Sequence, residues 1–143
     1  ASGRGAGSVG VGWRAGGSVW RTGTAPPPGR FRHASGSEIC LMRAAATRLQ
    51  SEGVAVRCVS RPSWELFEAQ TQNYKDDVLP PEVSARLAVE LGVSQGWRRY
   101  IGERGDMLGV ERFGASAPAA TLLREFGFTV DNVVARARKL LAR

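Results

Sequence analysis

The chain contains few of the residues from which most catalytic and metal centres are built. It has one histidine, His33, and two cysteines, Cys40 and Cys58, among its 143 residues. The cysteines form no C-x-x-C pair, and together with one histidine they give no familiar zinc-ligand spacing. We therefore expect two reduced, buried thiols and no metal site.

Long apolar runs are also missing. No run approaches the length of about 18 residues that a membrane-spanning helix needs. The first residues contain Arg and Gly but no continuous apolar stretch, which argues against a secretory signal. The sequence therefore predicts a cytoplasmic protein with no membrane partner.

Acidic residues are absent from the first 33 positions, and this explains the strongly basic character of the chain. The net charge is +7 and the isoelectric point is about 10.7, values that would suggest nucleic acid as a partner. Residues 1–33 carry five Arg, whereas residues 34–143 carry 15 basic and 13 acidic side chains. The latter part is close to neutral, so we expect no nucleic-acid partner.

The pattern around residues 54–70 predicts a strand followed by a helix. Val54–Ser60 is a short apolar, β-branched run bounded by Gly53 and a turn, as in a buried strand. Ser63 is a suitable N-cap for the helix that begins after it. Glu38–Ser51 shows helical spacing of apolar residues, with Gly53 as the residue that ends this helix. These segments predict a β-α-β arrangement.

The remaining segments continue this alternation. Ser84–Glu90 and Met107–Phe113 are predicted as strands, and Gly92–Arg99 as a loop or short helix. Pro118 starts a helix that Gly127 ends, and Thr129 caps a final helix. The apolar stripe of that helix comprises Val130, Val133, Val134, Ala137, Leu140 and Leu141. Strands that alternate with helices predict a three-layer α/β/α fold.

Residues 1–33 differ from the rest of the chain. They hold nine of the 18 glycines and three of the seven prolines, a composition that buries too little surface to offset the entropy of ordering. We expect a disordered segment here and a domain over residues 34–143. A linker or tail is the plain interpretation, and a basic arm that binds single-stranded nucleic acid is the functional one.

No residue is predicted to be catalytic, to bind a cofactor or to ligate a metal. His33 lies in the segment expected to be disordered, and Asp76-Asp77 is typical of a solvated turn. Glu65 and Glu68 suit the start of a helix, or a contact to a partner domain. Ser116 lies in a G-x-S-x-P string that lacks the second glycine of a nucleophile elbow and has no histidine partner in residues 34–143.

Several strings together resemble the C-terminal domain of transketolases. The first runs Val-Arg-Cys-Val-Ser-x-Pro-Ser-Trp-Glu-Leu-Phe-x-x-Gln over residues 56–70, and the others agree in order and spacing from Ala34 to Leu141. One departure is Arg61, which stands where the family usually has Met. The other matching strings are Ser35–Glu38, Tyr74, Val78–Pro80, Ala88–Glu90, Gly96-Trp97, Tyr100–Gly102, Phe113–Pro118 and Phe126–Thr129.

This resemblance sharpens the interpretation of the segment before Ala34. In the family a strand, typically beginning Pro-Asp-Val, ends at the turn that Ser35–Glu38 matches, whereas Gly29–His33 is a poor buried strand. Codon degeneracy allows GGA CGT TTC CGT CAT for these residues. Read one nucleotide later, that string encodes Asp-Val-Ser-Val and then Ile or Met. We hypothesise that residues up to about 33 are translated out of frame or come from a damaged gene.

The resemblance implies a mainly parallel, mixed sheet of about five strands and a structural role. Transketolases transfer a two-carbon ketol unit between sugar phosphates of the pentose phosphate pathway, with thiamine diphosphate and a divalent metal (Mg or Ca). In that family the cofactor and the catalytic residues belong to the other domains and to the homodimer partner. The chain is therefore expected to be a fragment that binds no cofactor and is inactive alone. An aromatic and Arg-rich surface near Trp64, Trp97, Tyr100 and Phe113 is expected to pack on those domains, with ordinary core as the alternative for each of the four.

Two alternatives stay open from the sequence. The first is the equivalent domain of another thiamine diphosphate enzyme, such as a 2-oxo acid dehydrogenase β-subunit. The second is a free-standing binding module with a basic N-terminal arm. The Trp-Glu-Leu-Phe and Phe-Gly-Ala-Ser-Ala-Pro strings favour transketolase over both.

Overall fold

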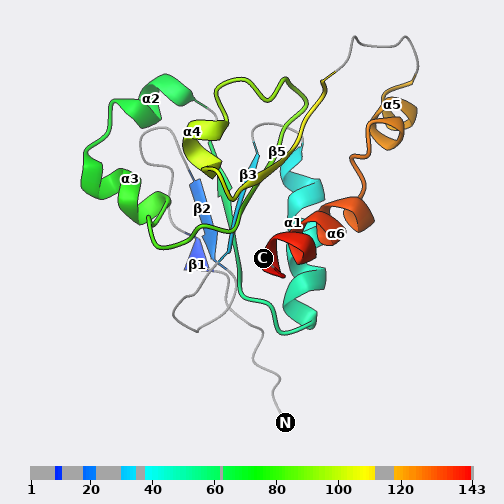
Figure 1. Ribbon diagram of the computed structural model, residues 1–143, viewed down its shortest axis with the longest axis horizontal. Helices are drawn as coiled ribbons and strands as arrows, with labels where there is room; N and C mark the ends of the chain where they lie inside the picture. Colours follow the sequence, from blue (N-terminus) through cyan, green and yellow to red (C-terminus); the bar gives the residue numbers. More distant parts are fainter. Residues whose placement is uncertain are drawn as a thin grey trace.

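The computed structural model of the chain describes residues 9–10, 18–21, 30–34, 38–61, 63–111 and 118–142. Within these segments a sheet is covered by helices on both faces (Figure 1). The three-layer α/β/α architecture expected from the sequence is therefore confirmed.

The sheet of the described residues is mixed, with four parallel strands at its centre and one side. Its order is β1-β2-β4-β3-β5-β6, in which β2 pairs antiparallel with β4 and β1 pairs antiparallel with β2. The bounds are β1 Val9–Gly10, β2 Ser18–Arg21, β3 Arg30–Ala34, β4 Val56–Ser60, β5 Arg86–Val89 and β6 Asp106–Leu108. The expected mixed, mainly parallel sheet is present, with one strand more than the five expected.

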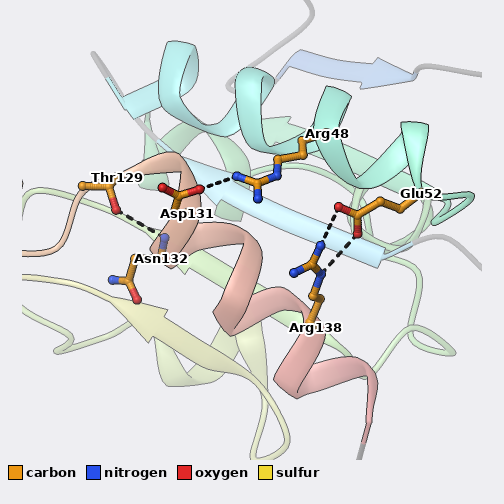
Figure 2. Close-up of polar contacts among 6 residues, drawn as sticks. All are labelled: Arg48, Glu52, Thr129, Asp131, Asn132 and Arg138. Atoms are coloured by element: carbon orange, nitrogen blue, oxygen red, sulfur yellow. Dashed lines mark hydrogen bonds and ion pairs between the residues drawn. The ribbon is translucent and has the colours of Figure 1, made fainter.

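One face of the sheet is covered by two closely packed helices that run in the same direction (Figure 2). These are α1, Glu38–Ser51, and α6, Val130–Leu141. Both helices present an apolar side to β4 and β5, as their periodicity predicts. The buried side chains of this core are Met42, Ala45, Ala46, Leu49, Val56, Cys58, Leu87, Val89, Leu108, Phe128, Val133, Val134, Ala137 and Leu140.

Ion pairs join the exposed sides of α1 and α6 (Figure 2). Arg48 of α1 pairs with Asp131 in the first turn of α6. Glu52, just after α1, accepts hydrogen bonds from Arg138 at 2.6 and 3.2 Å. These side chains are partly exposed, so each pair contributes at most about 1 kcal/mol. They align the two helices, whereas the buried apolar contact stabilises them.

The opposite face is covered by shorter helices. α2, Trp64–Glu68, follows β4, and α3, Gln72–Val78, and α4, Arg98–Ile101, complete the layer. The core beneath them contains Val59, Phe67, Val78, Leu79, Val83 and Tyr100. The remaining helix is α5, Ala119–Glu125. It precedes α6, and the connection between the two helices contains Gly127.

The helix starts agree with the capping residues that the sequence predicts. The amide of Leu66 donates to the Ser63 hydroxyl at 3.2 Å, and the amide of Asn132 donates to Thr129 at 3.2 Å (Figure 2). Gly53 ends α1 with a φ of 79°, a conformation that favours glycine. α1 and α6 therefore begin and end where the sequence places them.

The largest correction concerns the first 33 residues, which were expected to be disordered. Their described parts form β1, β2 and most of β3, and β3 lies between β4 and β5. For these described residues the expectation is wrong, because it weighed local composition, whereas β3 pairs with strands that follow it in sequence. The other residues of 1–33 lie outside the described residues. The expected domain boundary at Ala34 therefore divides a central strand.

The structure also differs from the sequence prediction at a cysteine, at a helix and at the last predicted strand. Cys58 is buried as expected, but Cys40 is exposed, because it lies on the outer side of α1. The polar stretch 70–77 was not predicted to be helical, yet Thr71 caps α3 by accepting from the Tyr74 amide at 3.3 Å. The last predicted strand, Met107–Phe113, is too long, because β6 ends at Leu108 and residues 109–111 are not in a strand. Arg112, Phe113 and Ser116 lie outside the described residues.

Candidate functional site

The residues considered for acid–base chemistry do not come together in the described part of the chain. His33 lies within β3, in register with Val59 and Ala88. Asp76 and Asp77 lie on α3, where Asp76 accepts a hydrogen bond from Gln72 at 2.7 Å. Within the described residues, no group of three or more His, Cys, Asp or Glu is placed to hold a metal ion.

The most unusual side chain in the described residues is Arg61, at the end of β4. Its side chain is almost fully buried, with 1% relative exposure. The centre of its guanidinium lies 3.6 Å from the ring centroid of Tyr100 and 4.4 Å from that of Trp64. The rings of Trp97 and Phe67 follow at 5.0 and 5.4 Å. The cation is thus surrounded by four aromatic rings, in the range where cation–π attraction is effective.

The aromatic rings also contact one another edge to face. Trp64 meets Trp97 and Tyr100 with centroid distances of 5.1 Å for both pairs, and the ring planes are nearly perpendicular. Such pairs add about 0.5–1.5 kcal/mol each beyond the apolar area that they bury. We call Arg61, Trp64, Phe67, Trp97 and Tyr100 the aromatic cluster.

Arg61 lacks hydrogen-bond partners for all three side-chain nitrogens among the described residues. Burial lowers the pKa of its guanidinium from the usual value, and nearby Tyr100 and Glu68 oppose this effect. An arginine still carries its charge under these conditions. Cation–π attraction is therefore the main compensation for the cost of taking this charge out of water.

A polar network borders the aromatic cluster. Tyr100 donates its hydroxyl hydrogen to Glu68, and Lys75 donates to the same carboxylate at 3.1 Å. Arg99 pairs with it at 3.4 Å. The hydrogen bond from Tyr100 is the main cause that lowers the pKa of Glu68, with Lys75 and Arg99 adding to it. Glu68 is thus held as a carboxylate by neighbours from α3 and α4.

The aromatic cluster connects α2 to α4 but offers no open reaction centre. Trp97 and Tyr100 are 2% and 4% exposed, so for these two the packing-surface interpretation is wrong and the alternative, ordinary core, is correct. Their rings lie against the Arg61 guanidinium and the Trp64 ring. The sequence marked Arg61 only as a departure from a family pattern. Its aromatic neighbours lie up to 39 positions away, and local pattern does not reveal such contacts.

The described helices were compared with the length and hydropathy of membrane-spanning helices. None of them combines the length and the apolar character that crossing a bilayer requires.

Comparison with known proteins identifies clear relatives. The sequence model described as "Transketolase-like TK C-terminal domain" matches residues 31–129. A transketolase of Geobacillus stearothermophilus is 53% identical over 110 residues, which are 77% of this chain and 16% of the relative. A transketolase of Halalkalibacterium halodurans is 54% identical over 108 residues, again 16% of its length.

The solved structures agree with the sequence matches. The transketolase of Leishmania mexicana superimposes with a TM-score of 0.77 at 41% identity, and the match covers 87% of this chain and 18% of that one. The chain thus spans less than a fifth of the length of each of these three relatives.

Proposed function

The chain belongs to the transketolase family, whose C-terminal domain it matches, and from this premise we propose that it has a structural and assembly role. The enzyme it serves would transfer a two-carbon ketol unit between sugar phosphates. The chain itself would supply no catalytic residue and would be inactive alone. The observation that carries this proposal is the coverage, because the match takes 77% of this chain but 16% of the relative.

The other domains of such an enzyme would supply the cofactor site and the catalytic residues. Thiamine diphosphate and a divalent metal such as Mg or Ca would bind to the other transketolase domains, and the homodimer partner would complete the active site. The described residues favour this division, because their most elaborate side-chain arrangement, the aromatic cluster, is internal. Such an enzyme would work in the cytoplasm, without nucleic-acid or membrane partners.

The role of residues 1–33 is a separate proposal. We propose that residues up to about 33 are read out of frame, and that the shifted frame encodes an apolar strand in place of Arg30–His33. The support is the place of β3, which pairs on both sides with parallel strands. Central strands of parallel sheets are normally apolar. The flanking nucleotide sequence tests this directly, since a frame with no apolar strand would refute it.

The assembly role can be tested with the purified chain and a chimera. The chain with thiamine diphosphate and Mg²⁺ is expected to show no ketol transfer. In the chimera, residues 31–142 of this chain replace the matching part of the Geobacillus stearothermophilus transketolase, and ketol transfer is expected to persist. Activity of the isolated chain, or a chimera that loses activity while its other domains stay folded, would contradict the proposal.

A further inference from the structure

Three large apolar side chains are clearly exposed in the part of the chain that the structure describes. They are Leu66 at 54%, Leu91 at 42% and Val93 at 58% relative exposure. Single exposed apolar residues are common on protein surfaces and need no explanation. The position of these three in the fold makes them informative.

All three follow the carboxyl ends of parallel strands. Leu66 lies on α2, directly after β4, and Leu91 and Val93 lie in the connection from β5 to α4. Because β4 and β5 are parallel neighbours of β3, their carboxyl ends lie at the same edge of the sheet. In Figure 1 α2 and this connection lie at the same end of the molecule. We call Leu66, Leu91 and Val93 the apolar edge.

The backbone beneath the apolar edge is held in place. The Val110 amide donates to the Gly92 carbonyl at 2.9 Å, and the Ser94 amide donates to the Glu111 carboxylate at 3.0 Å. A Cβ atom on Gly96 would lie 3.0 Å from the Trp64 ring, so α2 and the connection are in close contact. The aromatic cluster joins the same two segments from the inside.

The apolar edge therefore lies on segments whose backbone is held by hydrogen bonds and ring contacts. Its three side chains remain exposed to solvent. Flexible loops that expose apolar residues can fold them away, whereas these segments are tied by hydrogen bonds and ring contacts. Burying the exposed parts of these three side chains would be favourable, because it removes apolar surface from water. A docking partner that covers this edge would gain that energy with little ordering cost.

We propose that the apolar edge is the surface on which this domain docks to the preceding domains of a transketolase chain. This inference rests on the proposed assembly role. The occupant is chosen because the matched relatives extend far beyond this domain, which makes up 16% of the Geobacillus stearothermophilus enzyme. In these relatives the rest of the chain is covalently joined to this domain, so it is always available as a docking partner.

The test uses the chimera and two matched double variants. Leu66→Lys with Val93→Lys places charges on the apolar edge. Ala44→Lys with Thr47→Lys places the same charges on the exposed side of α1, on the other face of the sheet. In the isolated 143-residue chain both pairs should leave the unfolding temperature unchanged, because all four sites are exposed.

In the chimera the two pairs should behave differently. The Leu66 and Val93 pair should raise the rate of proteolytic cleavage at the domain junction about tenfold, the effect of losing one or two interface contacts. The α1 pair should leave that rate unchanged. Equal cleavage rates for both variants and the unsubstituted chimera would overturn the docking surface while the assembly role stands. An unsubstituted chimera that is folded but inactive would overturn the assembly role and the docking inference together.

Discussion

Arg61 is the residue around which the aromatic cluster packs. Its guanidinium is buried among four rings without a hydrogen-bond partner in the described residues. A charge in this place costs desolvation energy, and cation–π attraction returns about 2 kcal/mol or more at desolvated sites. Methionine, the residue that the resemblance to transketolases leads us to expect at this position, would fill the same space with a polarizable sulfur and no charge.

Substitution of Arg61 should separate packing from charge. Arg61→Met is expected to raise the free energy of unfolding by about 1–2 kcal/mol, because it removes unpaired buried donors and keeps the contacts with the rings. Arg61→Ala is expected to lower it by about 2–4 kcal/mol, because it leaves a cavity among the rings. Urea denaturation followed by tryptophan fluorescence measures both, and a destabilising Arg61→Met would show that the charge itself stabilises the cluster.

Glu68 predicts how stability depends on pH. Its pKa in the folded chain is lowered from the usual 4.5, first by the hydrogen bond from Tyr100 and then by Lys75 and Arg99. The folded state therefore binds this proton less readily than the unfolded state, and the stabilisation is present above about pH 4.5. It is lost as the pH falls through the lower, folded-state pKa.

Glu68→Gln should remove this pH-dependent contribution. The variant is expected to be less stable than the parent at pH 7 by about 1 kcal/mol, a modest value because the carboxylate is partly exposed. The difference should shrink below about pH 4. Thermal unfolding from pH 3 to pH 7 measures it, with Glu103→Gln in an exposed turn as the control. A constant difference over this range would assign the effect to packing.

At the level of elements, local pattern was sufficient where one face of a helix is apolar and its ends are capped. α1 and α6 could be predicted with their bounds because Met42, Leu49 and Val133 recur at helical spacing and Gly53 and Thr129 mark ends. α3 was missed since Thr71 is its main signal and the helix buries only Val78. β3 was missed because its sequence contradicts its place, and only pairing with β4 and β5 reveals it.

The place of β3 leads to a prediction about its residues. Arg32 is in register with Cys58 and Leu87, both of which are buried in the core under α1 and α6. Replacing Arg30, Arg32 and His33 together by Val should raise the free energy of unfolding by about 1–3 kcal/mol, because a central parallel strand favours apolar, β-branched residues.

The measurement is chemical denaturation of the triple variant beside Arg104→Val. Arg104 lies in an exposed turn, so its replacement should change stability by less than about 0.5 kcal/mol. A triple variant that is less stable than the parent would show that the charged residues of β3 suit their surroundings, and the out-of-frame hypothesis would lose its structural support.

At the level of the whole molecule, the sheet connects segments that the sequence prediction assigned to separate parts of the chain. The three-layer fold and the transketolase resemblance could be predicted, since they depend on residues 34–143 and their spacing. The boundary at Ala34 could not, because the order β4-β3-β5 puts residues from before it between two strands from after it. The aromatic cluster was hidden for the same reason, since Arg61, Trp64 and Tyr100 meet only after α2 and α4 have packed.

Truncation tests which boundary is physically correct. A chain beginning at Ser35 lacks β1, β2 and β3, so β4 and β5 lose their common neighbour and the sheet is opened at its centre. This chain is expected to show no cooperative thermal unfolding by circular dichroism. A chain beginning at Gly29 keeps β3 and loses only the antiparallel strands beside β4, so it should unfold cooperatively at a lower temperature than the parent. If instead the shorter chain unfolds as cooperatively and at the same temperature as the parent, β3 adds nothing to the core, and a domain that starts near Ala34 is the correct description.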